Sequence, residues 1–163
     1  MGNLITSGRR GADHDLQLSN GSTSVLLCVL LLSGSQLATT VWERELVTWL
    51  AEHDQEVFGS GMVGFDLDDI AWDVERFGVQ QHFVLRMIDL ALQRHRWNEL
   101  GYDPPFVDAQ LAALRTLVAD FRPDAHASAS TWSWRSPPEQ LILCDRHRVF
   151  IHNLGCLLCH DGV

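Results

Sequence analysis

The chain has 163 residues, of which 46% are hydrophobic, and it carries a formal net charge of −9. This length is sufficient for one compact domain with a core and too short for two full domains. The negative charge argues against a general nucleic-acid binder, because acidic surfaces repel phosphates, whereas it would accelerate the approach of a basic protein partner. All twelve basic residues are Arg, a bias typical of GC-rich coding that favours a bacterial source.

Residues 1–23 mix Gly, Ser, Asn and isolated charges without a helical or strand period, so we expect a mobile leader. The apolar run Val25–Leu32 that follows predicts a strand buried on both faces. A signal-like segment is the alternative for this run. The run is too short to cross a bilayer, which needs about 20 apolar residues, and Asp13 and Asp15 precede it. We therefore expect a cytoplasmic chain without a membrane segment.

Three longer helices are predicted after this run. Thr40 and Glu43 form a capping-box pattern that predicts a helix start at Val41. The strongest helical periodicity covers Val79–Trp97 and predicts the central helix. A clean apolar stripe then predicts a last helix from about Val107.

Acidic residues gather between the first two of these helices. Asp66 can cap a short fourth helix with Asp68 and Asp69 in its first turn and Val74 pointing inward, because the helix dipole favours negative charge there. The carboxylates could instead bind a divalent cation, but the alternating ligands and distal Glu of a calcium loop are missing. The preceding glycine-rich loop, residues 58–65, lacks both common phosphate-binding patterns.

Residues 123–140 are rich in Ala, Ser and Pro and predict a linker or lid. Trp132 and Trp134 in this segment either pack back onto the core or stand exposed. Exposed tryptophans would be candidate contact residues, because Trp is enriched where partners bury surface. The candidate partner-binding residues are Asp66, Asp68, Asp69, Trp132 and Trp134.

The last segment, residues 141–163, carries the clearest chemistry. Cys144-x-x-His147 and Cys156-x-x-Cys159 offer four ligands of the kinds that zinc binds, on two short knuckles that a β-hairpin can join. The segment resembles zinc-ribbon and zinc-knuckle fingers. This resemblance implies a structural Zn²⁺ held by all four residues, without implying any activity.

Other interpretations of the same cysteines remain open. Cys156-Leu-Leu-Cys159-His160 also matches the haem c attachment pattern, and the cysteines could be thiols without a metal. In the zinc interpretation, His152 and His160 remain as substitute ligands or as neighbours of the metal. Cysteines clustered beside His favour metal ligation over disulfides, and with it a reducing compartment.

These elements together predict an α+β fold. About four helices would form a core domain over residues 24–122. The Val25–Leu32 strand and the C-terminal hairpin would form a small sheet at its side.

The sequence shows no Ser/His/Asp or Cys/His/Asn arrangement of a nucleophilic enzyme, which favours a non-enzymatic binding protein. A small, acidic, Trp-rich domain with a closing zinc finger is similar in general character to bacterial toxin-immunity proteins. This similarity implies that an acidic face occupies the basic cleft of a toxin. Two alternatives are a metal-dependent enzyme that uses His82, His95 or the cluster 66–73, and a zinc-finger regulator in which Arg146 and Arg148 contact nucleic acid.

Overall fold

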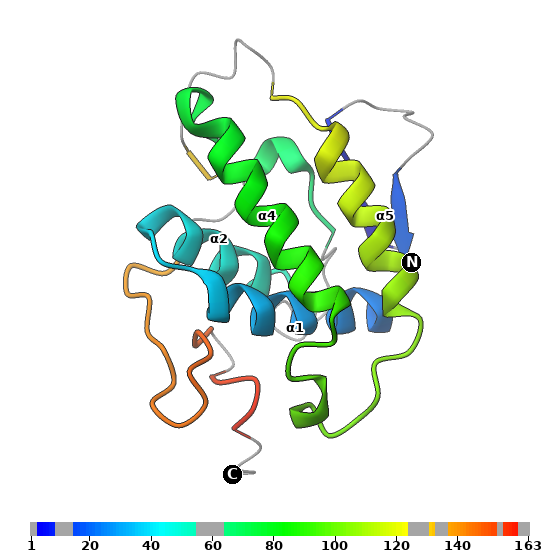
Figure 1. Ribbon diagram of the computed structural model, residues 1–163, viewed down its shortest axis with the longest axis vertical. Coiled ribbons are helices and arrows are strands. Elements are labelled where there is room, and N and C mark those ends of the chain that lie inside the picture. The colour runs from blue at the N-terminus through cyan, green and yellow to red at the C-terminus, as the bar shows by residue number, and fades with distance from the viewer. Residues whose placement is uncertain are drawn as a thin grey trace.

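The computed structural model describes residues 3–8, 15–54, 64–123, 131–132, 137–152 and 155–159. Within these residues the chain is mainly helical with one small antiparallel sheet, so the predicted α+β class is confirmed (Figure 1). The main elements are β1 (Asn3–Ile5), β2 (Leu16–Leu18), α1 (Asn20–Leu37), α2 (Val41–Ala51), α4 (Phe77–Leu92) and α5 (Val107–Asp120). Single 3-10 turns lie in the connections: η1 (Leu67–Asp69), η2 (Val74–Arg76) and η3 (Trp97–Glu99).

The longest helix, α1, is the centre of the fold, a place that the sequence analysis gave to α4. It packs against α2, α4 and α5 (Figure 1). Most of its middle is buried: Leu26, Val29 and Leu32 have no exposed surface, whereas Val25 and Cys28 are half-buried. By length and composition α1 could cross a membrane, and 56% of its 18-residue window is buried within the fold, as in the core helix of a globular protein.

The predicted strand at Val25–Leu32 is wrong, because these residues lie inside α1. An apolar run that is buried all round has no period that separates a helix from a buried strand. The helix begins earlier, where the Ser19 Oγ accepts a hydrogen bond from the Ser22 N–H. This cap satisfies one of the free N–H groups at the helix start and so favours the helical form.

The small sheet lies at the N-terminus instead. β1 pairs antiparallel with β2, and Ile5 has no exposed surface. The Asn3 side chain donates hydrogen bonds to the side chains of Asn20 and Thr23 at the start of α1. The expectation of a mobile leader over residues 1–23 is therefore corrected for its described part, residues 3–8 and 15–23, which is built into the fold.

The remaining helices agree with the predictions except at the end of α4. α2 begins at Val41 with the predicted capping box, and α5 begins at Val107. α4 ends at Leu92, earlier than predicted, because Arg94 and Arg96 adopt left-handed backbone conformations with φ of 61° and 59°. The chain turns there and leads through η3 to α5.

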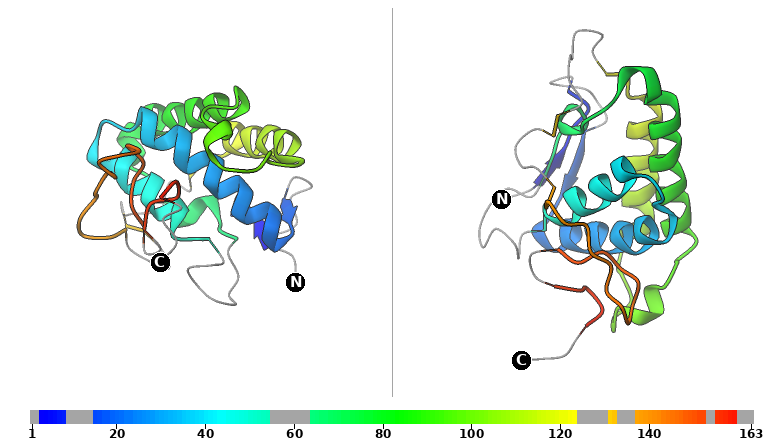
Figure 2. Two further views of the ribbon diagram at one scale, coloured as in Figure 1. Left: turned by 90° about the horizontal axis from the view of Figure 1, so that it is seen from below. Right: turned by 90° about the vertical axis from the view of Figure 1, so that its left-hand side faces the viewer.

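The helices are arranged around α1 so that one of its sides is left for the C-terminal segment. α4 and α5 lie side by side, and the C-terminal residues run along α1 and α2 on the side away from α5 (Figure 2). This arrangement places the predicted metal ligands against the first half of the chain.

Candidate metal centre

The C-terminal segment, residues 137–152 and 155–159, is anchored on the helical core. Val149 has no exposed surface, and Phe150 is 2% exposed. The Phe150 N–H donates a hydrogen bond of 3.1 Å to the Ser35 Oγ on α1. Leu158 is buried as well. These anchors lie between and beside the predicted ligands, so they fix both cysteine-containing turns relative to α1.

Two short turns present the ligands. In the first, the Arg148 N–H donates to the Cys144 carbonyl (2.8 Å) and the Cys144 N–H donates to the Val149 carbonyl (2.9 Å). In the second, the Cys159 N–H donates to the Cys156 carbonyl (3.1 Å). Each turn therefore closes one of the two ligand spacings and brings both of its side chains to the same side.

The predicted β-hairpin between the turns is not confirmed. In the described part of residues 141–163, strand pairing is limited to isolated antiparallel bridges of Leu143 with Phe150 and of His152 with Gly155. Arg148 and Gly155 have positive φ values of 57° and 90°. These two residues bend the backbone on either side of residues 149–152, which leaves little room for a longer series of hydrogen-bonded strand pairs.

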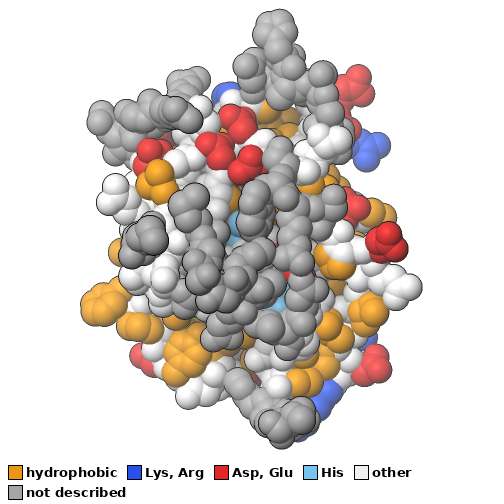
Figure 3. Space-filling model, turned by 180° about the vertical axis from the view of Figure 1, so that it is seen from behind, with side chains coloured by type: hydrophobic (Ala, Val, Ile, Leu, Met, Phe, Trp, Pro, Cys, Tyr) orange, Lys and Arg blue, Asp and Glu red, His pale blue; other side chains and the backbone are white. Residues whose placement is uncertain are grey.

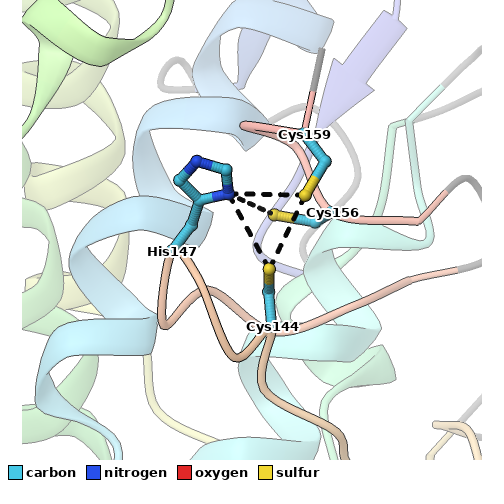
Figure 4. A group of neighbouring side chains, drawn as sticks. All are labelled: Cys144, His147, Cys156 and Cys159. Atoms are coloured by element: carbon cyan, nitrogen blue, oxygen red, sulfur yellow. Dashed lines mark hydrogen bonds between the residues drawn. The ribbon is translucent and has the colours of Figure 1, made fainter. Parts of the chain in front are cut away.

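The four side chains converge on one point (Figure 4). The Cys144 Sγ lies 3.7 Å from both the His147 Nδ1 and the Cys159 Sγ. The His147 Nδ1 lies 3.7 Å from the Cys156 Sγ and 3.4 Å from the Cys159 Sγ. All four atoms lie within 4.8 Å of one another, so the group could hold a metal ion.

These separations match a tetrahedron around zinc. With Zn–S bonds of about 2.3 Å and a Zn–N bond of about 2.0–2.1 Å, two sulfurs lie about 3.8 Å apart, and a sulfur and a nitrogen lie about 3.5 Å apart. The observed separations are 3.7 Å between the Cys144 and Cys159 sulfurs and 3.4–3.7 Å between the His147 Nδ1 and the three sulfurs, and every pair of ligand atoms lies within 4.8 Å. A haem attached to Cys156 and Cys159 would leave Cys144 and His147 unexplained, although the structure brings both to the same point.

Hydrogen bonds within the cluster separate the pKa values of two of its thiols. The backbone N–H of His147 donates to the Cys144 sulfur and is the largest cause that lowers the pKa of Cys144 from 9.0 to about 6. The hydrogen bond to Cys144 is the largest cause that raises the pKa of Cys159 to about 11. Because the thiolate is the form that binds metal, Cys144 would be available to a metal at neutral pH, whereas Cys159 would have to release its proton on binding.

An ion pair from the turn after α4 interacts with the two knuckles. The Arg96 Nη2 donates a hydrogen bond of 3.0 Å to the Glu99 Oε1, and the Arg96 Nε donates to the other carboxylate oxygen. Arg96 interacts electrostatically with Cys156, and Glu99 interacts with His147. Neither residue is predicted from the sequence, because nothing in their local pattern relates them to the distant knuckles.

The other candidate ligands stand apart from this cluster. His152 is half-buried at an isolated bridge, and His160 lies outside the described residues. His82 is exposed on α4, and burial lowers the pKa of His95. Among the residues with described positions, only the Cys₃His group brings three or more His, Cys, Asp or Glu side chains to one point. No observation there favours a metal-dependent enzyme at His82 or His95.

Asp66 and Asp69 cap the turn η1, and the capping role of Asp66 agrees with the prediction. Asp66 accepts hydrogen bonds from the N–H groups of Gly8 and Asp68, and forms a capping box with Asp69. Asp68 is exposed, and acidic side chains gather in the upper part of the face shown in Figure 3. The element that Asp66 caps is a single 3-10 turn rather than the predicted fourth helix. Val74 was predicted to point inward, but it is 56% exposed because a separate turn, η2, begins there.

Trp132 packs back onto the core, which is one of its two predicted arrangements. Its ring stacks on Trp42 with centroids 6.2 Å apart, and it lies 5.4 Å from the ring of Trp49. The Trp132 Nε1–H donates a hydrogen bond to Glu45. Trp134 and most of the glycine-rich loop lie outside the described residues.

Comparisons with protein-family models, with curated proteins and with solved structures found no match. The function is therefore inferred from the metal centre, the fold and the surface of the chain itself.

Proposed function

We propose that Cys144, His147, Cys156 and Cys159 bind one structural zinc ion, which fastens the C-terminal segment to the helical core. The observation that carries this proposal is the convergence of the four ligand atoms within 4.8 Å, with one sulfur–sulfur and three sulfur–nitrogen separations within a few tenths of an ångström of those expected for tetrahedral zinc. Three sulfurs and one imidazole nitrogen are also the donor set of many structural zinc sites.

A structural role follows from the completeness of the ligand set. Catalytic zinc keeps a position open for water or substrate, whereas four protein ligands complete the tetrahedron here. The zinc would join turns on either side of the buried pair Val149 and Phe150. Since such a site cannot be preassembled in the unfolded chain, the free energy of metal binding adds to the free energy of folding.

Metal analysis of the chain purified without added metal tests this proposal. We expect one zinc per chain, and chelation should lower the Tm by more than about 10 °C. Cys156→Ser should lose the zinc. Cys28→Ser is the matched control, because Cys28 lies on α1 outside the metal group, and this variant should keep the zinc. Absence of zinc from the wild-type chain, or equal zinc in both variants, would contradict the proposal.

We also propose that the chain is a non-enzymatic binding module for a basic protein, of which a toxin is one example. A groove of about 470 Å³ between the first turns of α2 and α4 supports this proposal. The exposed side chains of Val41 (67%) and Val79 (73%) stand at the groove, and its charged lining consists of Glu43, Glu45 and Arg76. An apolar side chain followed by Lys or Arg, placed beside the two carboxylates, would complement this lining. This groove is the proposed contact.

Proteins that co-purify with the chain from its native host would test the second proposal. A partner should be lost from the double variant Val41→Asp/Val79→Asp and retained by Phe106→Asp, which changes an 86% exposed residue outside the groove lining. Association with that partner should slow as salt rises, because screening removes electrostatic steering. Retention of the partner by the double variant, or association that is insensitive to salt, would contradict the proposal.

A further inference from the structure

Two of the metal-ligating sulfurs lie close enough to form a disulfide after a small movement. The Cys144 Sγ and Cys159 Sγ are 3.7 Å apart, and a disulfide requires a separation of about 2.05 Å. These two cysteines come from different turns. A bond between them would therefore replace the link that the metal makes between the two turns.

The two sulfurs differ in their access to solvent. Cys159 is exposed, whereas Cys144 is buried with 7% of its surface accessible. A dissolved oxidant therefore reaches Cys159 first. Cys144 then lies within 3.7 Å to react with the oxidised sulfur. With zinc bound, Cys159 would be a thiolate, and an accessible thiolate beside a second cysteine is the arrangement found in oxidation-sensitive cysteine sites.

We propose that this zinc centre is a site of reversible oxidation by peroxide, which releases the zinc and links Cys144 to Cys159. The inference rests on the proposed zinc binding. It assigns the exposed Cys159 as the point of attack and the buried Cys144 as the residue that resolves the product.

The reaction balances in two steps. The Cys159 thiolate attacks hydrogen peroxide, the O–O bond breaks, hydroxide leaves, and a sulfenic acid forms. The Cys144 thiolate then attacks that sulfur, the S–O bond breaks, a second hydroxide leaves, and the disulfide forms. Two electrons pass from the two sulfurs to the peroxide, and two protons from solvent convert both hydroxides to water.

Loss of the metal follows from the remaining ligands. After oxidation only His147 and Cys156 still offer donor atoms in the described group. Two donors cannot complete the tetrahedron of a structural zinc. A dithiol reductant would restore both thiolates and with them the binding site.

The test uses the full wild-type chain with the zinc that it carries on purification. Hydrogen peroxide is added, released zinc is measured with a chromogenic chelator, and the linked peptides are identified by mass spectrometry after proteolysis. We expect release of one zinc per chain, a cross-link between the peptides of Cys144 and Cys159, and recovery of zinc binding after dithiothreitol and added zinc. Cys28→Ser should respond in the same way, because Cys28 lies outside the metal group.

The possible failures can be distinguished. Wild-type chain that carries no zinc and takes up none would remove the proposed function together with this inference. Zinc that is present but retained under peroxide that fully oxidises glutathione would overturn this inference alone. A cross-link between Cys156 and Cys159, or sulfonic acid at Cys159 without a cross-link, would also overturn it. The cross-link is identified by mass spectrometry in the wild-type chain. The test therefore needs no substitution of a metal-ligating residue, which could prevent folding.

Discussion

Gly34 lies where α1 crosses α2 and α4, and its missing side chain allows that close approach. A Cβ at this position would lie 2.5 Å from the Val47 Cγ2 and 2.9 Å from the Met87 Sδ. Gly34→Ala should therefore lower the free energy of unfolding by about 1–3 kcal/mol, as overpacked cores do. Urea denaturation measures this change.

Gly21 provides the matched control in the same helix. A Cβ at Gly21 meets no atom within 4 Å in the described structure. Gly21→Ala should raise the free energy of unfolding by up to about 1 kcal/mol, because Ala has a higher helix propensity than Gly. A Gly34→Ala variant as stable as Gly21→Ala would contradict the packing of these three helices.

The ligands of the metal centre could be predicted from sequence because each pair is local. A Cys-x-x-His or Cys-x-x-Cys spacing fits a single turn, and the hydrogen bond between Cys159 and Cys156 closes such a turn. Arg96 and Glu99 could not be predicted in the same way. They interact electrostatically with Cys156 and His147 after the chain has turned at the left-handed residues Arg94 and Arg96, and no local pattern relates the two segments.

At the scale of elements, β1 differs most from the prediction, because a mobile leader was expected where the structure has a paired strand. Ile5 has no exposed surface, whereas its neighbour Leu4 is 42% exposed on the other face of the strand. Ile5→Ala should lower the free energy of unfolding by about 2–5 kcal/mol, because it leaves a cavity in the core. Leu4→Ala should cost less than about 1 kcal/mol by comparison. Equal, small effects in thermal denaturation would show that β1 is dispensable.

The ion pair between α4 and α5 gives a prediction about pH. Arg115 donates hydrogen bonds of 2.6 and 3.1 Å to the two carboxylate oxygens of Asp89, and it lowers the pKa of Asp89 below 3.8. A lowered folded pKa means that the pair stabilises the fold above the unfolded pKa and loses this effect as pH falls through the folded pKa. Both side chains are over 40% exposed, so the contribution is small.

Asp89→Asn should therefore lower the free energy of unfolding by about 0.5–1 kcal/mol at pH 7, and the difference from wild type should shrink as the pH falls below 3.8 and through the lowered folded pKa. Asp103→Asn is the control, because Asp103 is 88% exposed and lies 3.7 Å from Arg94. It should leave the stability unchanged at both pH values. A difference for Asp89→Asn that is constant with pH would contradict the assignment.

The mispredictions at α1 and at the N-terminal strands show what sequence patterns lack. α2 and α5 have one buried face and one exposed face, so their period was visible in the sequence. α1 is buried on nearly all sides, and its apolar run lost the period that identifies a helix. β1 and β2 have three residues each, which is too short for an alternating pattern to stand out.

At the scale of the whole molecule, the proposed zinc would help to hold the last part of the chain on the helical core. Val149 and Phe150 are buried against the helices, but strand pairing in the described part of residues 141–163 is limited to isolated bridges. A segment with so little regular structure gains order chiefly from its anchors. The zinc would supply the anchor that joins its two turns.

X-ray absorption at the zinc edge of the purified chain tests the central claim most directly, because it reports the atoms bound to the metal. The account predicts one zinc per chain with three sulfurs at about 2.3 Å and one nitrogen at about 2.0–2.1 Å. The spectrum of Cys28→Ser should be identical, since Cys28 is outside the described metal group. A zinc shell made only of nitrogen and oxygen, or a chain that carries no zinc, would contradict the account.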